Sequence, residues 1–218
     1  SHAGTARNRM TGRRTHAAVK RGLDWILAAL GLCVLSPLFA AIAVWIRLDS
    51  PGSAFFRGLR AGRYGKDFEM LKFRTMRSVP AKGNPITVRD DPRITRAGRI
   101  LRKLKMDELP QLINILRGEM SFVGPRPEDP QYVASYTPRQ RQLLEYTPGL
   151  TSLGSILYRD EASLLEGEDW ERVYCTEILP RKLEADLDYM ARASVWSDLK
   201  VLAQTAGILT LDSKRLQK

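Results

Sequence analysis

The sequence predicts a mostly helical α+β fold with an N-terminal re-entrant (kinked) membrane helix, a small β-hairpin and amphipathic interfacial helices around a compact core. Three observations support this prediction. An apolar run without charge extends from Trp25 to Ile46, two strand-like segments flank a glycine-rich link, and several segments of helical period follow. We expect a disordered basic tail at 1–18, the membrane helix at 19–48 and a membrane-associated domain at 49–218.

The net charge of +11 and the pI near 9.9 are concentrated in the first half of the chain. Residues 1–106 hold 22 Lys/Arg against 6 Asp/Glu, a net charge of +16, and residues 107–218 hold 13 against 18, a net charge of −5. Such a pI is typical of nucleic-acid binding, but the apolar run makes anionic lipid and anionic substrate the better match.

The cysteine and histidine content excludes several classes of site. The two cysteines, Cys33 and Cys175, are far apart, which argues against a disulfide framework and indicates a reducing compartment. The two histidines, His2 and His16, both lie in the basic tail. Zinc sites of the Cys/His type and Ser-His-Asp catalysis are therefore excluded.

The apolar run is long enough to just span a bilayer, at about 1.5 Å per residue across roughly 30 Å of hydrocarbon. Two features favour a re-entrant helix instead. Ser36-Pro37 lies at its midpoint, where proline removes a helical hydrogen bond and kinks the axis. Basic residues flank both ends, and positive flanks tend to stay on the cytoplasmic side. A simple spanning helix remains the alternative.

After this run, Ala54–Arg57 and Phe68–Phe73 are predicted to pair as a hairpin around the link from Gly58 to Lys66. Thr95 can cap a helix that runs to about Lys105 and is rich in arginine. That helix has either a solvated basic face or an interfacial face that binds anionic lipid.

A second helix is expected to begin near Asp107 and to end at Gly118. Near the C-terminus, Ser197 or Asp198 is expected to cap a last amphipathic segment that turns Leu199 and other apolar residues inward.

Asp107 and Glu108 form the most distinctive polar pattern. Asp is favoured as a helix cap, so capping is one interpretation. In the other, the helix dipole and nearby cations keep Asp107 ionised as a nucleophile, and the pair holds Mg²⁺ for phosphoryl transfer. Downstream, Pro125 and Pro127 restrict the backbone around Arg126.

Ordered motifs across nearly the whole chain support a family resemblance. They are Lys20-Arg21 with Asp24, Ser36-Pro37, Phe55-Phe56 with Arg60, Gly62, Gly65 and Lys66, Lys72-Phe73-Arg74-Thr75-Met76, the block from Asp91 to Gly98, the block from Asp107 to Asn114, the block from Gly118 to Pro127, and Pro148-Gly149-Leu150-Thr151. With these motifs the chain resembles the bacterial sugar transferases, the monotopic polyprenyl-phosphate phosphoglycosyl transferases.

The resemblance implies a cytoplasmic catalytic domain at 49–218 on the bacterial inner membrane. A UDP-sugar would donate a phosphosugar to undecaprenyl phosphate, with Mg²⁺ near Asp107 and no nucleic-acid partner; a homodimer stays open. Asp107 would be the nucleophile that holds the phosphosugar, and Glu108 its partner carboxylate. The implied substrate-binding residues are Arg102 and Arg126, with Lys72, Arg74 and Glu119 as weaker candidates for the electrostatic frame.

The chain departs from the family pattern at three places. Gly58 replaces a frequent Gln, Lys105 replaces Ser or Thr, and the segment from Thr151 to Ile156 replaces a frequent Thr-Gly-x-Ala-Gln-Val-Asn. The last difference leaves the identity of the transferred sugar undetermined. The alternative function is a non-catalytic, membrane-tethered basic module that binds anionic lipid or nucleic acid.

Overall fold

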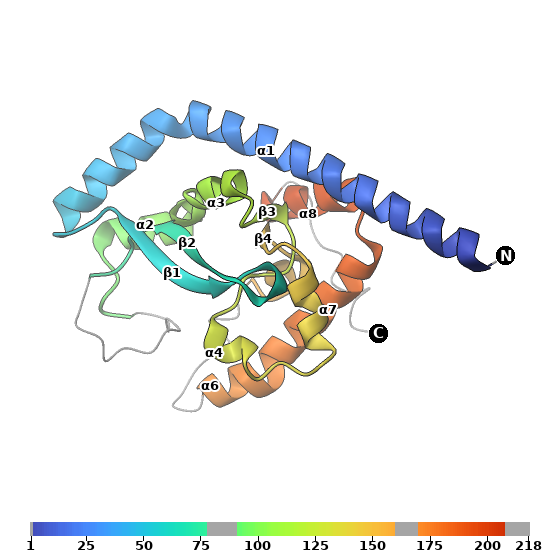
Figure 1. The fold of residues 1–218 in the computed structure, drawn as a ribbon. Helices are drawn as coiled ribbons and strands as arrows, with labels where there is room; N and C mark the ends of the chain where they lie inside the picture. Colours follow the sequence, from blue (N-terminus) through green and yellow to red (C-terminus); the bar gives the residue numbers. More distant parts are fainter. Residues whose placement is uncertain (1, 78–90, 160–169, 208–218) are drawn as a thin grey trace.

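The computed structural model describes residues 2–77, 91–159 and 170–207 (Figure 1). Its longest element, α1 (His2–Asp49), lies across one side of the molecule and bends nearer to its C-terminal end than to its start, with Pro37 inside the helix. The Ser36 hydroxyl donates to the Cys33 carbonyl over 2.9 Å. Ala18–Asp49 is long and apolar enough to cross a membrane. Because α1 begins at His2, it includes most of the range for which the sequence predicts disorder, and that division of the chain stays a prediction.

The predicted hairpin is confirmed. Strands β1 (Phe55–Ala61) and β2 (Asp67–Phe73) pair antiparallel around a short 3₁₀ turn, η1 (Arg63–Gly65). β1 extends beyond the predicted end at Arg57, because its pairing with β2 continues to Ala61 opposite Asp67.

The arginine-rich helix α2 (Arg96–Lys103) is capped as predicted, because Thr95 Oγ1 accepts the Gly98 N–H over 2.9 Å. A Cβ at Gly98 would lie 2.0 Å from the Thr75 carbonyl oxygen, so the close approach of α2 to that backbone requires glycine. The helix buries Leu101 and leaves Ile100 exposed. The apolar residues of α2 are therefore divided between the core and the surface.

The second predicted helix begins later than expected. A 3₁₀ turn, η2 (Met106–Glu108), precedes α3 (Gln111–Arg117), whose N-cap is Pro110. Gly118 ends α3 in the left-handed conformation with φ of 85°, as its sequence position predicted.

A second small sheet joins β3 (Ser121–Val123) and β4 (Gly149–Thr151), which run parallel. The chain between them contains α4 (Pro130–Val133) and the 3₁₀ segment η3 (Gln140–Glu145). After β4 come α5 (Leu153–Leu157), α6 (Trp170–Val173), a π-helical turn η5 (Tyr174–Ile178), α7 (Leu179–Arg192) and α8 (Val195–Thr205). The fold is therefore mostly helical α+β, as predicted.

The start of α8 corrects the predicted cap. Ser194, not Ser197 or Asp198, caps the helix, and Ser197 completes a capping box with it. Asp198 instead binds Lys20 of α1. Leu199, expected to face inward, is exposed, because the face of α8 that carries Val201 packs on the core.

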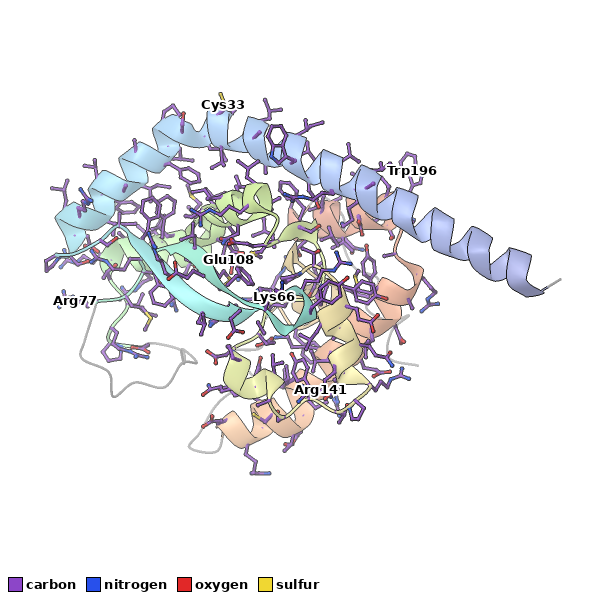
Figure 2. The ribbon with its side chains drawn as sticks, in the orientation of Figure 1. Cys33, Lys66, Arg77, Glu108, Arg141 and Trp196 are labelled. Atoms are coloured by element: carbon purple, nitrogen blue, oxygen red, sulfur yellow. The ribbon has the colours of Figure 1, made fainter. Side chains whose placement is uncertain are left out.

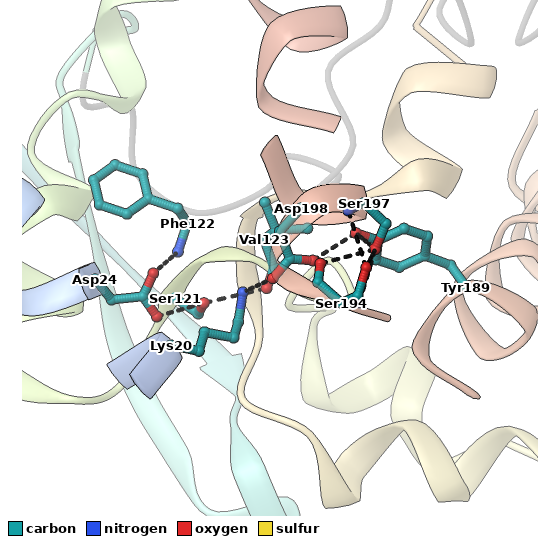
Figure 3. Close-up of polar contacts among 9 residues, drawn as sticks. All are labelled: Lys20, Asp24, Ser121, Phe122, Val123, Tyr189, Ser194, Ser197 and Asp198. Carbon is teal, nitrogen blue, oxygen red and sulfur yellow. Dashed lines mark hydrogen bonds and ion pairs between the residues drawn. The ribbon is translucent and has the colours of Figure 1, made fainter. Parts of the chain in front are cut away.

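Both halves of α1 pack on the rest of the protein. Before the bend, Ala28 joins a core cluster with Leu112 of α3, and after it Ile46 joins a cluster with Phe73 of β2. Figure 3 shows the polar contacts of the first half, where Asp24 accepts a hydrogen bond from Ser121 over 2.7 Å. α1 is thus attached to the domain on both sides of its bend.

Candidate active site

Three segments that are distant in the sequence bring the predicted carboxylate pair together with two of its predicted cations. Strand β2 presents Lys72, the turn η2 presents Asp107 and Glu108, and the loop after β3 presents Arg126. Oε1 of Glu108 lies 2.9 Å from Nζ of Lys72 and 3.7 Å from Nη2 of Arg126. Figure 2 shows Glu108 in the interior of the molecule, on the side of α1 opposite to Cys33. These four residues form the candidate site.

The sequence around Lys105 explains the shape of the turn. α2 ends at Lys103 with Leu104 as its C-cap, and Lys105 takes the left-handed conformation with φ of 57° and ψ of 20°. A non-glycine residue with positive φ is uncommon, and here it redirects the chain between two helices. Pro110 then fixes the start of α3. Asp107 therefore lies in the turn before α3, and neither helix uses it as a cap.

Asp107 is a buried carboxylate. Its exposed fraction is 9%, and within the described ranges 2–77, 91–159 and 170–207 no hydrogen bond or ion pair reaches its oxygens. Burial raises the pKa of Asp107, while the charges of Lys72, Arg102 and Lys105 lower it and that of Glu108 raises it further. The expected role of the helix dipole in ionising Asp107 is wrong, because α3 starts only at Gln111. A desolvated carboxylate is more basic than a solvated one, which favours nucleophilic attack.

Glu108 is tuned in the opposite direction. Burial opposes its ionisation, but the Lys72 ammonium and the Arg126 guanidinium outweigh burial and hold the pKa of Glu108 at about 2. Glu108 is therefore ionised at neutral pH, and it holds the side chains of Lys72 and Arg126 in place through two ion pairs.

Arg102 interacts with Asp107 through its charge. Its Nε donates to Thr75 Oγ1 over 2.9 Å, which fixes the side chain against the end of β2. Burial lowers the pKa of Arg102, and the charges of Asp107 and Asp91 oppose that effect. The structure therefore brings the Arg102 charge within electrostatic reach of Asp107.

Arg74 has a different set of partners. It is buried, and its guanidinium donates to the carbonyls of Ser50 and Pro51, each over 2.6 Å, just past the end of α1. A Cβ at Gly52 would lie 2.3 Å from Nη1 of Arg74, so the turn at Gly52 leaves room for this contact. The structure does not group Arg74 with Glu108.

Asn114 is a residue of the site's framework that the sequence reasoning quoted within a motif but assigned no role. It is fully buried on α3, where its Oδ1 accepts the Leu71 N–H over 3.0 Å. Its Nδ2 donates to the Glu69 carbonyl over 2.8 Å and to Glu119 over 2.7 Å. Asn114 therefore holds β2, and with it Lys72, against α3. The only signal in the sequence is its place in the motif that begins at Asp107.

The carboxylates fit one mode of Mg²⁺ binding. Within the part of the chain that the structure describes, no group of three His, Cys, Asp or Glu residues could hold a metal ion. Mg²⁺ is commonly held by one or two carboxylates together with substrate phosphates. Asp107, whose oxygens receive no hydrogen bond or ion pair from the described residues, matches the protein part of such a site, whereas Glu108 is already paired with Lys72.

Comparison with known proteins identifies the family of the chain. The family model described as bacterial sugar transferase matches residues 15–212, which include every residue of the candidate site. A UDP-glucose:undecaprenyl-phosphate glucose-1-phosphate transferase of Caulobacter vibrioides is 39% identical over 199 residues, covering 89% of this chain and 71% of that protein.

Two further relatives are longer. The Escherichia coli K12 protein with the same activity in its name is 36% identical over 197 residues, covering 86% of this chain and 39% of its own length. A UDP-N-acetylgalactosamine-undecaprenyl-phosphate N-acetylgalactosaminephosphotransferase of Aeromonas hydrophila is 34% identical over 195 residues, covering 87% of this chain and 43% of its own. The chain thus spans less than half of these two proteins. By the extent of these matches, it belongs to the bacterial sugar transferase family.

Proposed function

We propose that this protein transfers a sugar 1-phosphate from a UDP-sugar to undecaprenyl phosphate at the cytoplasmic face of the bacterial inner membrane. The product would be the first membrane-bound intermediate of a glycoconjugate. The observation that carries the proposal is the grouping of a buried Asp107 with Glu108, Lys72 and Arg126. The names of the relatives support the same reaction, with glucose or N-acetylgalactosamine as the sugar.

In the first half-reaction, a carboxylate oxygen of Asp107 attacks the phosphorus that bears the sugar. The bond from that phosphorus to the oxygen bridging to UMP breaks, and UMP leaves with the electron pair. The burial of Asp107 supports this role, because a poorly solvated carboxylate loses little hydration on attack. Arg126 and Arg102 would stabilise the charge on the phosphate oxygens.

In the second half-reaction, an oxygen of undecaprenyl phosphate attacks the same phosphorus. The bond to Asp107 breaks, the carboxylate is restored, and a polyprenyl diphosphate-sugar leaves. Glu108, with a pKa of about 2, is too weak a base to take a proton at neutral pH. Its proposed role is therefore to orient Lys72 and Arg126 toward the phosphates.

A divalent cation fits this proposal. Asp107 and the diphosphate of the donor would hold Mg²⁺, which would supply positive charge against the phosphate oxygens. Lys72 and Arg126 would remain on Glu108 and complete the cationic surroundings of the donor.

The test uses the protein in lipid nanodiscs with labelled UDP-glucose or UDP-N-acetylgalactosamine. Wild type is expected to release UMP only with Mg²⁺ and, without acceptor, to retain labelled sugar phosphate after denaturation. Asp107→Asn should lower turnover by at least about 10³-fold and retain no label. Asp67→Asn, at an exposed position in the hairpin, is the matched control. Turnover by Asp107→Asn would refute the assignment of Asp107 as the nucleophile. An absence of UMP release by wild type would favour the alternative function, a non-catalytic membrane-tethered module.

We further propose that α1 enters one leaflet and returns. Before the bend, Arg21 donates to the Ile115 and Leu116 carbonyls over 2.6 and 3.0 Å. At the far end, Asp49 accepts the Ala97 N–H over 3.0 Å. Because the residues that flank the apolar run on either side bind one domain, the proposal puts both flanks on one side of the membrane.

The topology is tested in a Cys33→Ala, Cys175→Ala background. Single cysteines at the exposed positions Ala18 and Ser53, introduced as Ala18→Cys and Ser53→Cys, should both react with an impermeant maleimide in inverted vesicles. Lys66→Cys, in the hairpin, marks the cytoplasmic side. Labelling of the two flanks from opposite faces would establish a spanning helix instead.

A further inference from the structure

The loop that carries Arg126 is held by a group outside the proposed machinery. β3 and β4 run parallel, so the segments that follow them leave the sheet at the same edge. One contains Pro125, Arg126 and Pro127, and the other contains Ser152 and Gly154. Two prolines flank Arg126, so its N–H is the single backbone donor in that tripeptide.

The buried carboxylate of Asp186, on α7, lies between these two segments. Its exposed fraction is 3%, and Oδ1 accepts the Gly154 N–H over 2.7 Å. The carboxylate also accepts the backbone N–H of Arg126. A Cβ at Gly154 would lie 3.1 Å from Oδ1, so glycine permits this approach. One side chain therefore joins α7 to both loops.

We propose that Asp186 is a positioning residue for the transfer site, because it fixes the backbone from which the Arg126 guanidinium reaches Glu108. The proposal rests on the proposed function for its catalytic consequence. The guanidinium lies 3.7 Å from Glu108, and the N–H of Arg126 is held by Asp186, while the preceding Pro125 carbonyl accepts the Gly149 N–H of β4 over 2.9 Å. A shift of this loop would change the distance between Arg126 and the donor phosphates.

The ionisation of Asp186 agrees with this role. Burial raises the pKa of Asp186 to about 6, against its hydrogen-bond donors and the nearby charge of Lys182. The group is therefore ionised at neutral pH, when both oxygens can accept. A neutral amide at this position has only one acceptor oxygen, so it leaves one of the two backbone N–H groups without a partner.

The same carboxylate also holds the segment in which this chain departs from its family. Gly154 belongs to the stretch from Thr151 to Ile156. Asp186 thus couples the position of Arg126, which would bind the donor phosphates, to that of the segment whose sequence differs from the family pattern.

The first arm of the test is hydrogen exchange of the full chain in nanodiscs. Asp186→Asn should speed exchange at the Arg126 and Gly154 amides, read from peptides that cover 121–129 and 149–158. Tyr189→Phe is the matched control, because it removes hydrogen bonds to Asp198 and Ser197 from the same helix without touching either loop. Unchanged exchange at both amides in Asp186→Asn would overturn the structural link, whatever reaction the protein catalyses.

The second arm is a double-mutant cycle on kcat/KM for the labelled donor. Asp186→Asn should lower kcat/KM by roughly 10- to 100-fold in wild type, as expected for a misplaced catalytic group. In an Arg126→Ala background the same change should cost at most about twofold. Equal losses in both backgrounds would show that Asp186 does not act through Arg126. If exchange changes but wild type transfers no sugar phosphate, the proposed function fails and the link stands.

Discussion

The Lys72 ammonium and the Glu108 carboxylate form a 2.9 Å ion pair that joins strand β2 to the turn carrying Asp107. Each side chain is about one-fifth exposed, so solvent screens this pair less than the surface pair of Arg57 and Glu69. The pair therefore contributes to stability as well as to the electrostatics of the site.

We expect Glu108→Gln to lower the free energy of unfolding by roughly 2–3 kcal/mol at pH 7. The folded pKa of Glu108, about 2, lies below its ordinary value of 4.5. The stabilisation is therefore present above pH 4.5 and is lost as the pH falls toward 2. The denaturation midpoints of variant and wild type should converge in acid. Glu69→Gln, in the exposed pair, should change stability by at most about 1 kcal/mol. A larger effect there would contradict the expectation that the Lys72–Glu108 pair contributes more to stability than the exposed pair does.

Arg74→Lys should destabilise the protein by about 1–3 kcal/mol, because a lysine cannot reproduce the fork of bonds to Ser50 and Pro51. The KM for the donor should change by less than about twofold, since the guanidinium points to the end of α1. Denaturation and donor titration measure the two effects separately. A tenfold rise in KM with unchanged stability would return Arg74 to the substrate-binding set. Arg57→Lys, at an exposed pair, is the control.

Asn114→Asp should lower stability by about 2 kcal/mol or more, because a carboxylate oxygen would then face the Glu69 carbonyl and the Glu119 carboxylate. Adding Glu119→Gln should restore part of the loss, since a glutamine amide can donate to the new aspartate. Thermal unfolding of the two variants measures the rescue. If Glu119→Gln deepens the loss, the assigned orientation of the Asn114 amide is wrong.

The sequence predicted those elements whose signals are local. The hairpin, the Thr95 cap and the end of α3 at Gly118 each depend on a few neighbouring residues, and each is confirmed. The predicted start of α3, near Asp107, was wrong because Asp107-Glu108 resembles a helix cap. A left-handed Lys105 and a proline at position 110 move that start to Gln111, and a left-handed lysine has no signature in the sequence.

The contacts that complete the site are not local. Motif order predicted that Lys72, Glu108 and Arg126 belong together, and the structure brings them within ion-pair range. The direction in which Arg74 points depends on how α1 ends, and no periodicity reveals that. Asp186 lies 60 positions from Arg126, and its acceptor role follows only from the packing of α7 against two loops.

The attachment of α1 to α8 gives a last prediction. Lys20 binds Asp198, which also accepts a hydrogen bond from Tyr189 (Figure 3). Lys20→Met leaves the largely buried Asp198 carboxylate without its cation, and should cost about 1–3 kcal/mol of unfolding free energy. Lys20→Met with Asp198→Asn should cost less than the sum of the single variants, because the double variant leaves no unpaired charge. Strictly additive losses in thermal unfolding would show that the two groups do not interact, whereas recovery in the double variant identifies this pair as one of the links that hold the part of α1 before the bend on the domain.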